Sequence, residues 1–225
     1  MSRRLPVYIL IDTSGSMKGE PIESVKVGLS DMIASLRLDP YALETACISI
    51  ITYDKDVKQI LPLTELENLQ IPDIECPDSG PTHTGAALNM LCDCYDKEVN
   101  MGSREQKGDW MPLLFVLTDG KPSDLMVYEE AINNVKRHQF TNIVACAAGP
   151  KGGASHRKMA DPLKRLYGEL QICSTQAIFH QCKNSAFSRQ FRIFSSQTII
   201  CFNIANNYSA TFRCFPIFLF DDMVC

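Results

Sequence analysis

The chain has 225 residues, enough for one domain with an extension, and a domain of this size can fold without disulfides or a metal. Hydrophobic residues make up 45% and charged residues 21%, as in ordinary soluble globular proteins. The formal net charge of −4 argues against a general nucleic-acid binder or a binder of anionic membranes, because both need a clustered positive field.

The first part of the chain does not resemble a secretory signal. Its apolar run, Val7–Ile11, is too short for a signal-peptide core and breaks at once into Asp12-Thr13-Ser14-Gly15. No stretch of the sequence is apolar for long enough to span a bilayer. We therefore expect a cytoplasmic protein whose ten cysteines are mostly reduced packing residues.

Strand and helix patterns alternate from the start of the chain. Pro6–Ile11 is a continuous apolar run, which is typical of a strand buried on both faces of a parallel sheet. Pro21–Leu38 has apolar residues at helical spacing, and Asp39-Pro40 is predicted to end that helix. Ala46–Tyr53 has the β-branched composition of a strand, and Val57–Leu61 is predicted to return beside it as a hairpin.

The alternation continues through the middle of the chain. Ile71–Pro81 is predicted to be a loop, Thr84–Val99 and Leu125–Arg137 helices, and Leu113–Thr118 and Asn142–Ala148 buried strands. This order predicts an α/β fold with a central, mostly parallel sheet, one antiparallel edge strand and helices on both faces.

The end of the chain has a different composition. We predict that residues 1–170 form the domain and that residues 171–225 form a tail rich in Phe and Cys. A further strand is predicted at Glu169–Cys173, across this boundary. No Asp or Glu occurs between Gln171 and Phe220. The tail is a real extension, a disordered segment or a product of an altered reading frame. We favour the altered frame, because ordinary protein surfaces carry carboxylates.

The strongest chemical signal is Asp12-Thr13-Ser14-Gly15-Ser16, directly after the first strand. In open α/β sheets, ligands bind outside the carboxyl ends of the strands, near the point where the strand order reverses. A strand-end carboxylate followed by hydroxyls at alternate positions offers three oxygens to one ion. Such ligands suit Mg²⁺, with Mn²⁺ and Ca²⁺ as alternatives, and do not suit zinc.

Two further segments supply oxygen ligands. Asp119 follows the strand Leu113–Thr118, and Thr82, with Thr84 as the alternate, precedes a helix. Each segment alone is also explained as a turn or a helix cap. Together they predict a metal site whose open position takes an incoming carboxylate, because the ion dominates the local electrostatics. The predicted metal ligands are Asp12, Ser14, Ser16, Thr82 and Asp119.

These motifs resemble the metal-ion-dependent adhesion site of von Willebrand factor A (vWA) domains. The resemblance rests on Asp12–Ser16, on Thr82-x-x-Gly85-x-Ala87-Leu88 and on Leu117–Gly120. Over about residues 3 to 170 the chain is also similar to the TerY proteins of bacterial tellurium-resistance clusters. The segments that carry this second similarity are Arg4–Tyr8, Gly19–Glu23, Asp39–Ala46 and Gln106–Trp110.

The resemblance implies a Rossmann-like sheet with the metal at its upper edge. It implies that Asp12, Ser14 and Ser16 hold the ion, while Thr82 and Asp119 reach it directly or through water. It also implies action by binding and not by catalysis. The implied partner is a protein that donates an Asp or Glu carboxylate, such as a protein kinase, a phosphatase or another tellurium-resistance protein.

The sequence departs from the family pattern at Pro81 and His83, where glycine or small residues are usual. It also lacks the Phe-Phe-Lys-Trp type segment with which TerY-like proteins usually close.

Three other interpretations stay open. The first is a Mg²⁺-dependent phosphatase-like enzyme with Asp12 as nucleophile and Asp119 and Asp124 as metal ligands. That chemistry needs a second acid two residues after the nucleophile, where this chain has Ser14. The second interpretation is an interaction domain without metal. The third is phosphate contact by the basic residues between positions 151 and 215, although the chain has no recognisable nucleic-acid-binding fold.

Overall fold

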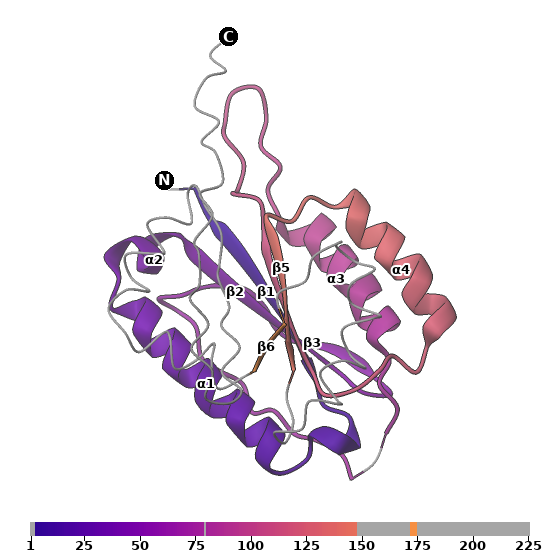
Figure 1. Cartoon of the computed structure of the whole chain (residues 1–225). Helices are drawn as coiled ribbons and strands as arrows, with labels where there is room; N and C mark the ends of the chain where they lie inside the picture. The colour runs from indigo at the N-terminus through magenta and orange to yellow at the C-terminus, as the bar shows by residue number, and fades with distance from the viewer. Residues whose placement is uncertain (1–2, 79, 148–171, 175–225) are drawn as a thin grey trace, which may run out of the picture.

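The computed structural model describes residues 3–78, 80–147 and 172–174, which form one sheet with helices on both faces (Figure 1). The sheet has six strands in the order β3-β2-β1-β4-β5-β6, and every neighbouring pair is parallel except β2 with β3. This arrangement confirms the predicted fold class. The strands are β1 (Leu5–Asp12), β2 (Ala46–Tyr53), β3 (Val57–Glu65), β4 (Leu113–Thr118), β5 (Asn142–Ala147) and β6 (Ile172–Ser174).

The helices divide between the two faces. The helix α1 (Glu20–Arg37) and the short α2 (Pro40–Thr45) lie on one face, whereas α3 (Thr84–Glu98) and α4 (Leu125–Arg137) lie on the other (Figure 1). A single 3₁₀ turn, η1 (Gly15–Met17), connects β1 to α1. Because both faces are covered, all eight residues of β1 and all eight of β2 are buried.

Alternate residues of each strand belong to two separate cores. Val7, Ile9 and Ile11 of β1 pack with α1, while Tyr8 and Leu10 pack with α3 and α4. Strand side chains alternate between faces, so the next residue after Ile11 continues the α3 and α4 side. Asp12 therefore lies on the face of the sheet that α3 and α4 cover, where its side chain contacts Thr118 of β4.

Two elements differ from the prediction. The strand β3 continues past Leu61 to Glu65 and includes Pro62, which is tolerated because β3 is an edge strand with irregular pairing to β2. Asp39 does not simply end α1. Its carboxylate accepts hydrogen bonds from Tyr41 N (2.9 Å) and Ala42 N (3.2 Å), and so begins α2 with a proline at the first position.

The last described strand is β6, which pairs with β5 in parallel through Ala145↔Ile172 and the two following residue pairs. It overlaps the predicted strand Glu169–Cys173. The rest of the predicted tail, from residue 175 to 225, lies outside the described residues. Among the helices of the described part, none is both long and apolar enough to cross a membrane.

Candidate metal site

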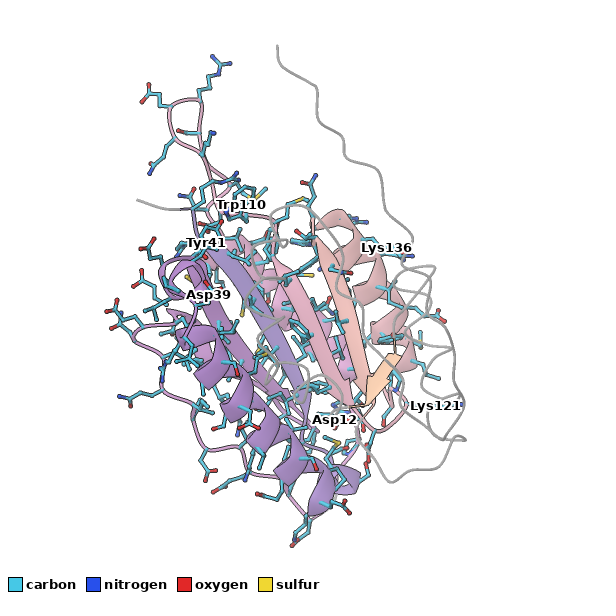
Figure 2. All side chains as sticks on the ribbon, turned by 60° about the vertical axis from the view of Figure 1, so that its left-hand side comes forward. Asp12, Asp39, Tyr41, Trp110, Lys121 and Lys136 are labelled. Carbon is cyan, nitrogen blue, oxygen red and sulfur yellow. The ribbon has the colours of Figure 1, made fainter. Side chains whose placement is uncertain are left out.

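The predicted ligands lie at the carboxyl ends of two neighbouring strands. Asp12 ends β1 and Asp119 follows β4, and these strands are adjacent at the centre of the sheet. The chain continues from β1 to β2 on one side, whereas β4 lies on the other, so the strand order reverses between them. Figure 2 labels Asp12 at this end of the sheet, together with Lys121 of the loop that follows Asp119.

Asp12 is fully buried, and both of its carboxylate oxygens accept hydrogen bonds. Its Oδ1 accepts from Ser14 N at 2.8 Å, and its Oδ2 accepts from Thr118 Oγ1 at 2.5 Å. Burial raises the pKa of Asp12, as does the nearby charge of Asp119, while the bonds from Thr118 and Ser14 lower it. The strand ends thus hold this carboxylate in one orientation.

A chain of side-chain contacts joins the loop after β1 to the loop after β4. The Ser14 and Ser16 hydroxyls lie 3.2 Å apart, and Ser16 Oγ donates to Asp119 Oδ1 at 2.8 Å. Burial raises the pKa of Asp119, and the bond from Ser16 lowers it. Four of the five predicted ligands are therefore linked through short contacts, although Ser16 and Asp119 are separated by 103 residues.

Thr82 comes from a third loop, which is held against the segment after β4. Thr82 N donates to Ser123 Oγ at 3.1 Å, and Ser123 N donates to Thr82 O at 2.8 Å. A Cβ atom added at Gly120 would lie 3.8 Å from Thr82 Oγ1. The Thr82 hydroxyl thus lies beside the residue that follows Asp119. The alternate, Thr84, is buried at the start of α3.

His83, which is not among the predicted ligands, faces the turn between β2 and β3. Its ring nitrogen Nδ1 lies 3.0 Å from Lys55 O, and its backbone N donates to Asp54 O at 3.0 Å. These two contacts attach the loop of Thr82 to the residues that follow β2.

Three residues that support the site were not predicted from the sequence. Thr118 is the last residue of β4 and donates to Asp12. Ser123 holds Thr82, as described above. Asp124 accepts from Gly85 N at 3.1 Å and from Ala86 N at 2.9 Å, and so caps α3, although it directly precedes α4. A Ser-Asp pair before a helix is an ordinary signal for capping that helix, and the sequence gives no sign that the acceptor serves a different one.

A sequence profile of the von Willebrand factor type A domain matches residues 7–175. This chain belongs to that family. The match includes β1 through β6 almost entirely and contains all five predicted ligands. The family consists typically of protein-interaction modules.

Among curated vWA relatives, matrilin-1 of Bos taurus is 31% identical over 127 residues, which are 55% of this chain and 23% of matrilin-1. The human collagen alpha-6(VI) chain is 26% identical over 167 residues, which are 72% of this chain and 7% of the collagen chain. The vWA chain thus spans about a quarter, or less, of the length of these relatives.

Solved structures share the fold of this vWA domain. The PilB minor pilin from Streptococcus sanguinis has a TM-score of 0.60 at 13% identity, covering 88% of this chain and 64% of the pilin. Proximal thread matrix protein 1 from the mussel byssus has a TM-score of 0.56 at 15% identity, covering 81% of this chain and 47% of that protein.

The donor set of this vWA domain suits a hard cation. Within residues 3–78, 80–147 and 172–174, no three His, Cys, Asp or Glu side chains converge, so a cation here would rest on two carboxylates and hydroxyls. Oxygen donors of this kind fit Mg²⁺, Mn²⁺ or Ca²⁺. Both carboxylates have raised pKa values because burial disfavours their negative charge. A bound cation would offset that cost of desolvation.

Proposed function

We propose that this vWA domain is a non-enzymatic, metal-dependent protein-interaction module. In this proposal Mg²⁺ is held by Asp12, Ser14, Ser16, Thr82 and Asp119, and an Asp or Glu side chain of a partner protein completes its coordination. The observation that carries the proposal is the 2.8 Å contact from Ser16 Oγ to Asp119 Oδ1. It supports the proposal because it joins an oxygen ligand of the turn after β1 to one of the loop after β4.

The ligand count favours a bridge between two proteins. Two carboxylates neutralise a divalent ion but leave an octahedral shell incomplete, so water and an external ligand must fill it. A carboxylate is the external ligand that the positive ion attracts most strongly. The partner is therefore expected to present an acidic side chain at its surface.

The geometry favours binding over phosphoryl transfer. Ser14 occupies the position of the general acid and its hydroxyl is far too weak an acid for that role. Asp124, which that mechanism would use for metal binding, instead caps α3.

We also propose that the chain is a TerY-like protein of a bacterial tellurium-resistance or stress-response system, acting in the cytoplasm. Two of the segments that carry this similarity lie against each other, Arg4–Tyr8 and Gln106–Trp110. Arg4 pairs with Asp109 at 2.7 Å, and Trp110 N donates to Arg4 O at 2.8 Å. Candidate partners are a protein kinase, a phosphatase or another tellurium-resistance protein that exposes an acidic side chain.

The first test is thermal unfolding with Mg²⁺ or Mn²⁺ and with chelator. A cation that binds only the folded state raises its stability, by about 2.7 kcal/mol at one hundred times its dissociation constant. We expect the wild-type midpoint to rise with the cation and the double variant Ser14→Ala/Ser16→Ala to show no rise. Ser35→Ala is the matched control, because the Ser35 hydroxyl bonds only within α1, to Asp31 O at 2.8 Å.

The same proteins test the bridge to a partner. A purified candidate partner should bind the wild type and Ser35→Ala with Mg²⁺, and should lose both interactions when chelator is added. Replacing the responsible acidic residue of the partner by its amide should also abolish binding. Binding that withstands the chelator would favour the metal-free interaction domain.

A further inference from the structure

Tyr53 places a buried hydroxyl beneath the candidate metal site. It is the last residue of β2 and pairs in register with Asp12, the last residue of β1. Its side chain belongs to the core that faces α3 and α4, the same side of the sheet toward which Asp12 points. Tyr53 is fully buried, and its hydroxyl is the only buried side-chain polar atom of the described residues that lacks a hydrogen-bond partner.

The groups around this hydroxyl belong to the site. The charge of Asp12 raises the pKa of Tyr53, and the nearby hydroxyls of Thr118 and Thr84 lower it. Burial has the largest effect and raises the pKa well above its ordinary value. The phenol is therefore neutral and keeps a proton to donate.

Thr118 offers Tyr53 an acceptor that already contacts Asp12. The proton of the Thr118 hydroxyl is directed to Asp12 Oδ2, and the oxygen accepts from Gly120 N at 3.2 Å. A hydroxyl oxygen has two lone pairs, so one remains for another donor. A bond from Tyr53 would complete a row of donors that ends on the carboxylate of Asp12.

An unpaired buried hydroxyl is unusual enough in folded proteins to require an explanation. A phenylalanine would fill nearly the same space and bring no unpaired polar atom. The hydroxyl is thus unfavourable in the metal-free state. Tyr53 pairs in register with Asp12, so a bound cation at Asp12 would lie close to this hydroxyl.

We propose that Tyr53 is a positioning residue of the metal site, whose hydroxyl donates to Thr118 when a cation is bound and so fixes the carboxylate of Asp12. This inference rests on the proposed metal-dependent function. Hydrogen bonds in a row polarise one another, so a bond from Tyr53 to Thr118 strengthens the bond that Thr118 makes to Asp12. Outer partners of this kind orient the ligands of metal sites.

Two tyrosine variants test this inference with opposite expected results. Tyr53→Phe removes the unpaired hydroxyl, so the metal-free protein should unfold at an unchanged or higher temperature, while the dissociation constant for Mn²⁺ should rise about tenfold. Tyr8→Phe is the matched control. Tyr8 is another fully buried residue of the same core, but its hydroxyl bonds to Glu98 Oε2 at 3.2 Å. Tyr8→Phe should lower the unfolding temperature and leave Mn²⁺ affinity unchanged.

A spectroscopic measurement separates positioning from packing. Adding Mg²⁺ should change the Raman bands that report tyrosine hydrogen bonding in the wild type and in Tyr8→Phe. The change should be absent in Tyr53→Phe, and also in Thr118→Val, which keeps Tyr53 but removes its acceptor.

Each outcome has a defined meaning. Equal Mn²⁺ affinity of Tyr53→Phe and the wild type would overturn the role of Tyr53, and so would a Raman change that persists in Tyr53→Phe or in Thr118→Val. In these cases the wild type still binds the cation, so the proposed function survives. If the wild type binds neither Mg²⁺ nor Mn²⁺, the proposed function and this inference are both overturned.

Discussion

At the scale of residues, the site combines two carboxylates whose charge is opposed by burial. The pKa of Asp12 and the pKa of Asp119 both lie above the ordinary value of 3.8, mainly because of desolvation. A carboxyl group with a raised pKa binds its proton more tightly in the folded state than in the unfolded state. Stability from this source is present below pH 3.8 and is lost as the pH rises through the raised pKa. The metal-free protein is therefore destabilised at neutral pH by the groups that would hold the cation.

Asp119→Asn tests this balance. In the presence of chelator at neutral pH, we expect the variant to be more stable than the wild type. The negative charge that burial disfavours is gone, while an amide oxygen still accepts from Ser16. The rise in unfolding temperature with Mg²⁺ should be lost. The two measurements are thermal unfolding with and without Mg²⁺ and thermal unfolding in chelator across a pH series.

The pH series supplies the internal control for Asp119→Asn. The advantage of the variant over the wild type should narrow as the pH falls toward 3.8, since the wild-type carboxylate then becomes neutral too. If the difference in unfolding temperature between the variant and the wild type stays constant over this range, its cause is not the charge of Asp119.

At the scale of elements, the beginnings of α3 and α4 hold the third loop of the site. Asp124 precedes α4 but caps α3, and Ser123 forms two hydrogen bonds with Thr82. Gly85, in the first turn of α3, faces the α4 backbone so closely that a Cβ atom there would lie 2.4 Å from Tyr128 N. The position of Thr82 thus depends on close contact between two helices.

Gly85→Ala should separate these helices. The added methyl group meets backbone atoms of α4, which cannot rotate away, so we expect a loss of about 1–3 kcal/mol in the free energy of unfolding. Mg²⁺ affinity should fall as well, because the Thr82 loop moves with α3. Denaturant unfolding and a Mg²⁺ titration measure the two effects.

Gly80→Ala is the matched control for Gly85→Ala. It lies in the same loop region, and a Cβ atom there would meet Asp54 Cβ at 3.9 Å, which is an ordinary contact. We expect a change within about 0.5 kcal/mol for this variant. Equal stability of the two alanine variants would contradict the role of close helix contact.

At the scale of the whole molecule, the site and a second polar cluster lie at opposite ends of the sheet. Figure 2 labels Trp110 at the far end from Asp12. In that cluster, Arg3 stacks on Trp110 with its guanidinium carbon 3.9 Å from the ring centre, and Arg4 pairs with Asp109. Asp109 also accepts from Asn100 N at 2.8 Å, which closes the loop between α3 and β4. Distant sites with no shared partners usually affect stability independently.

Asp109→Ala tests that independence. It removes the acceptor of Asn100 N and the carboxylate partner of Arg4, which keeps only its bond to Glu98 O at 3.0 Å. We therefore expect a loss of about 2 kcal/mol in the free energy of unfolding. The rise in unfolding temperature with Mg²⁺ should remain as large as in the wild type. Glu23→Gln, at an exposed ion pair with Lys26 on α1, is the control and should change little. Loss of the Mg²⁺ effect in Asp109→Ala would show that the two ends are coupled.

Local patterns in the sequence predicted much of the fold. The continuous apolar runs of β1 and β4 predicted buried parallel strands, because each strand must be covered on both faces. Since parallel strands end at one edge, strand direction alone was enough to place Asp12 and Asp119 together. The roles of these residues as metal ligands stay a prediction.

The sequence by itself therefore determined the order of the elements and the edge at which the polar residues gather, because these depend on periodicity and on strand direction. Only the tertiary structure decided which partners those residues have. Thr118 bonds to Asp12 across 106 residues, and Asp124 accepts from Gly85 N of another helix across 39 residues. Tyr53 resembles any core aromatic residue in the sequence, and its unpaired hydroxyl is revealed only by its position beside Asp12 on the next strand. Such contacts depend on how strands and helices pack, and no local pattern encodes them.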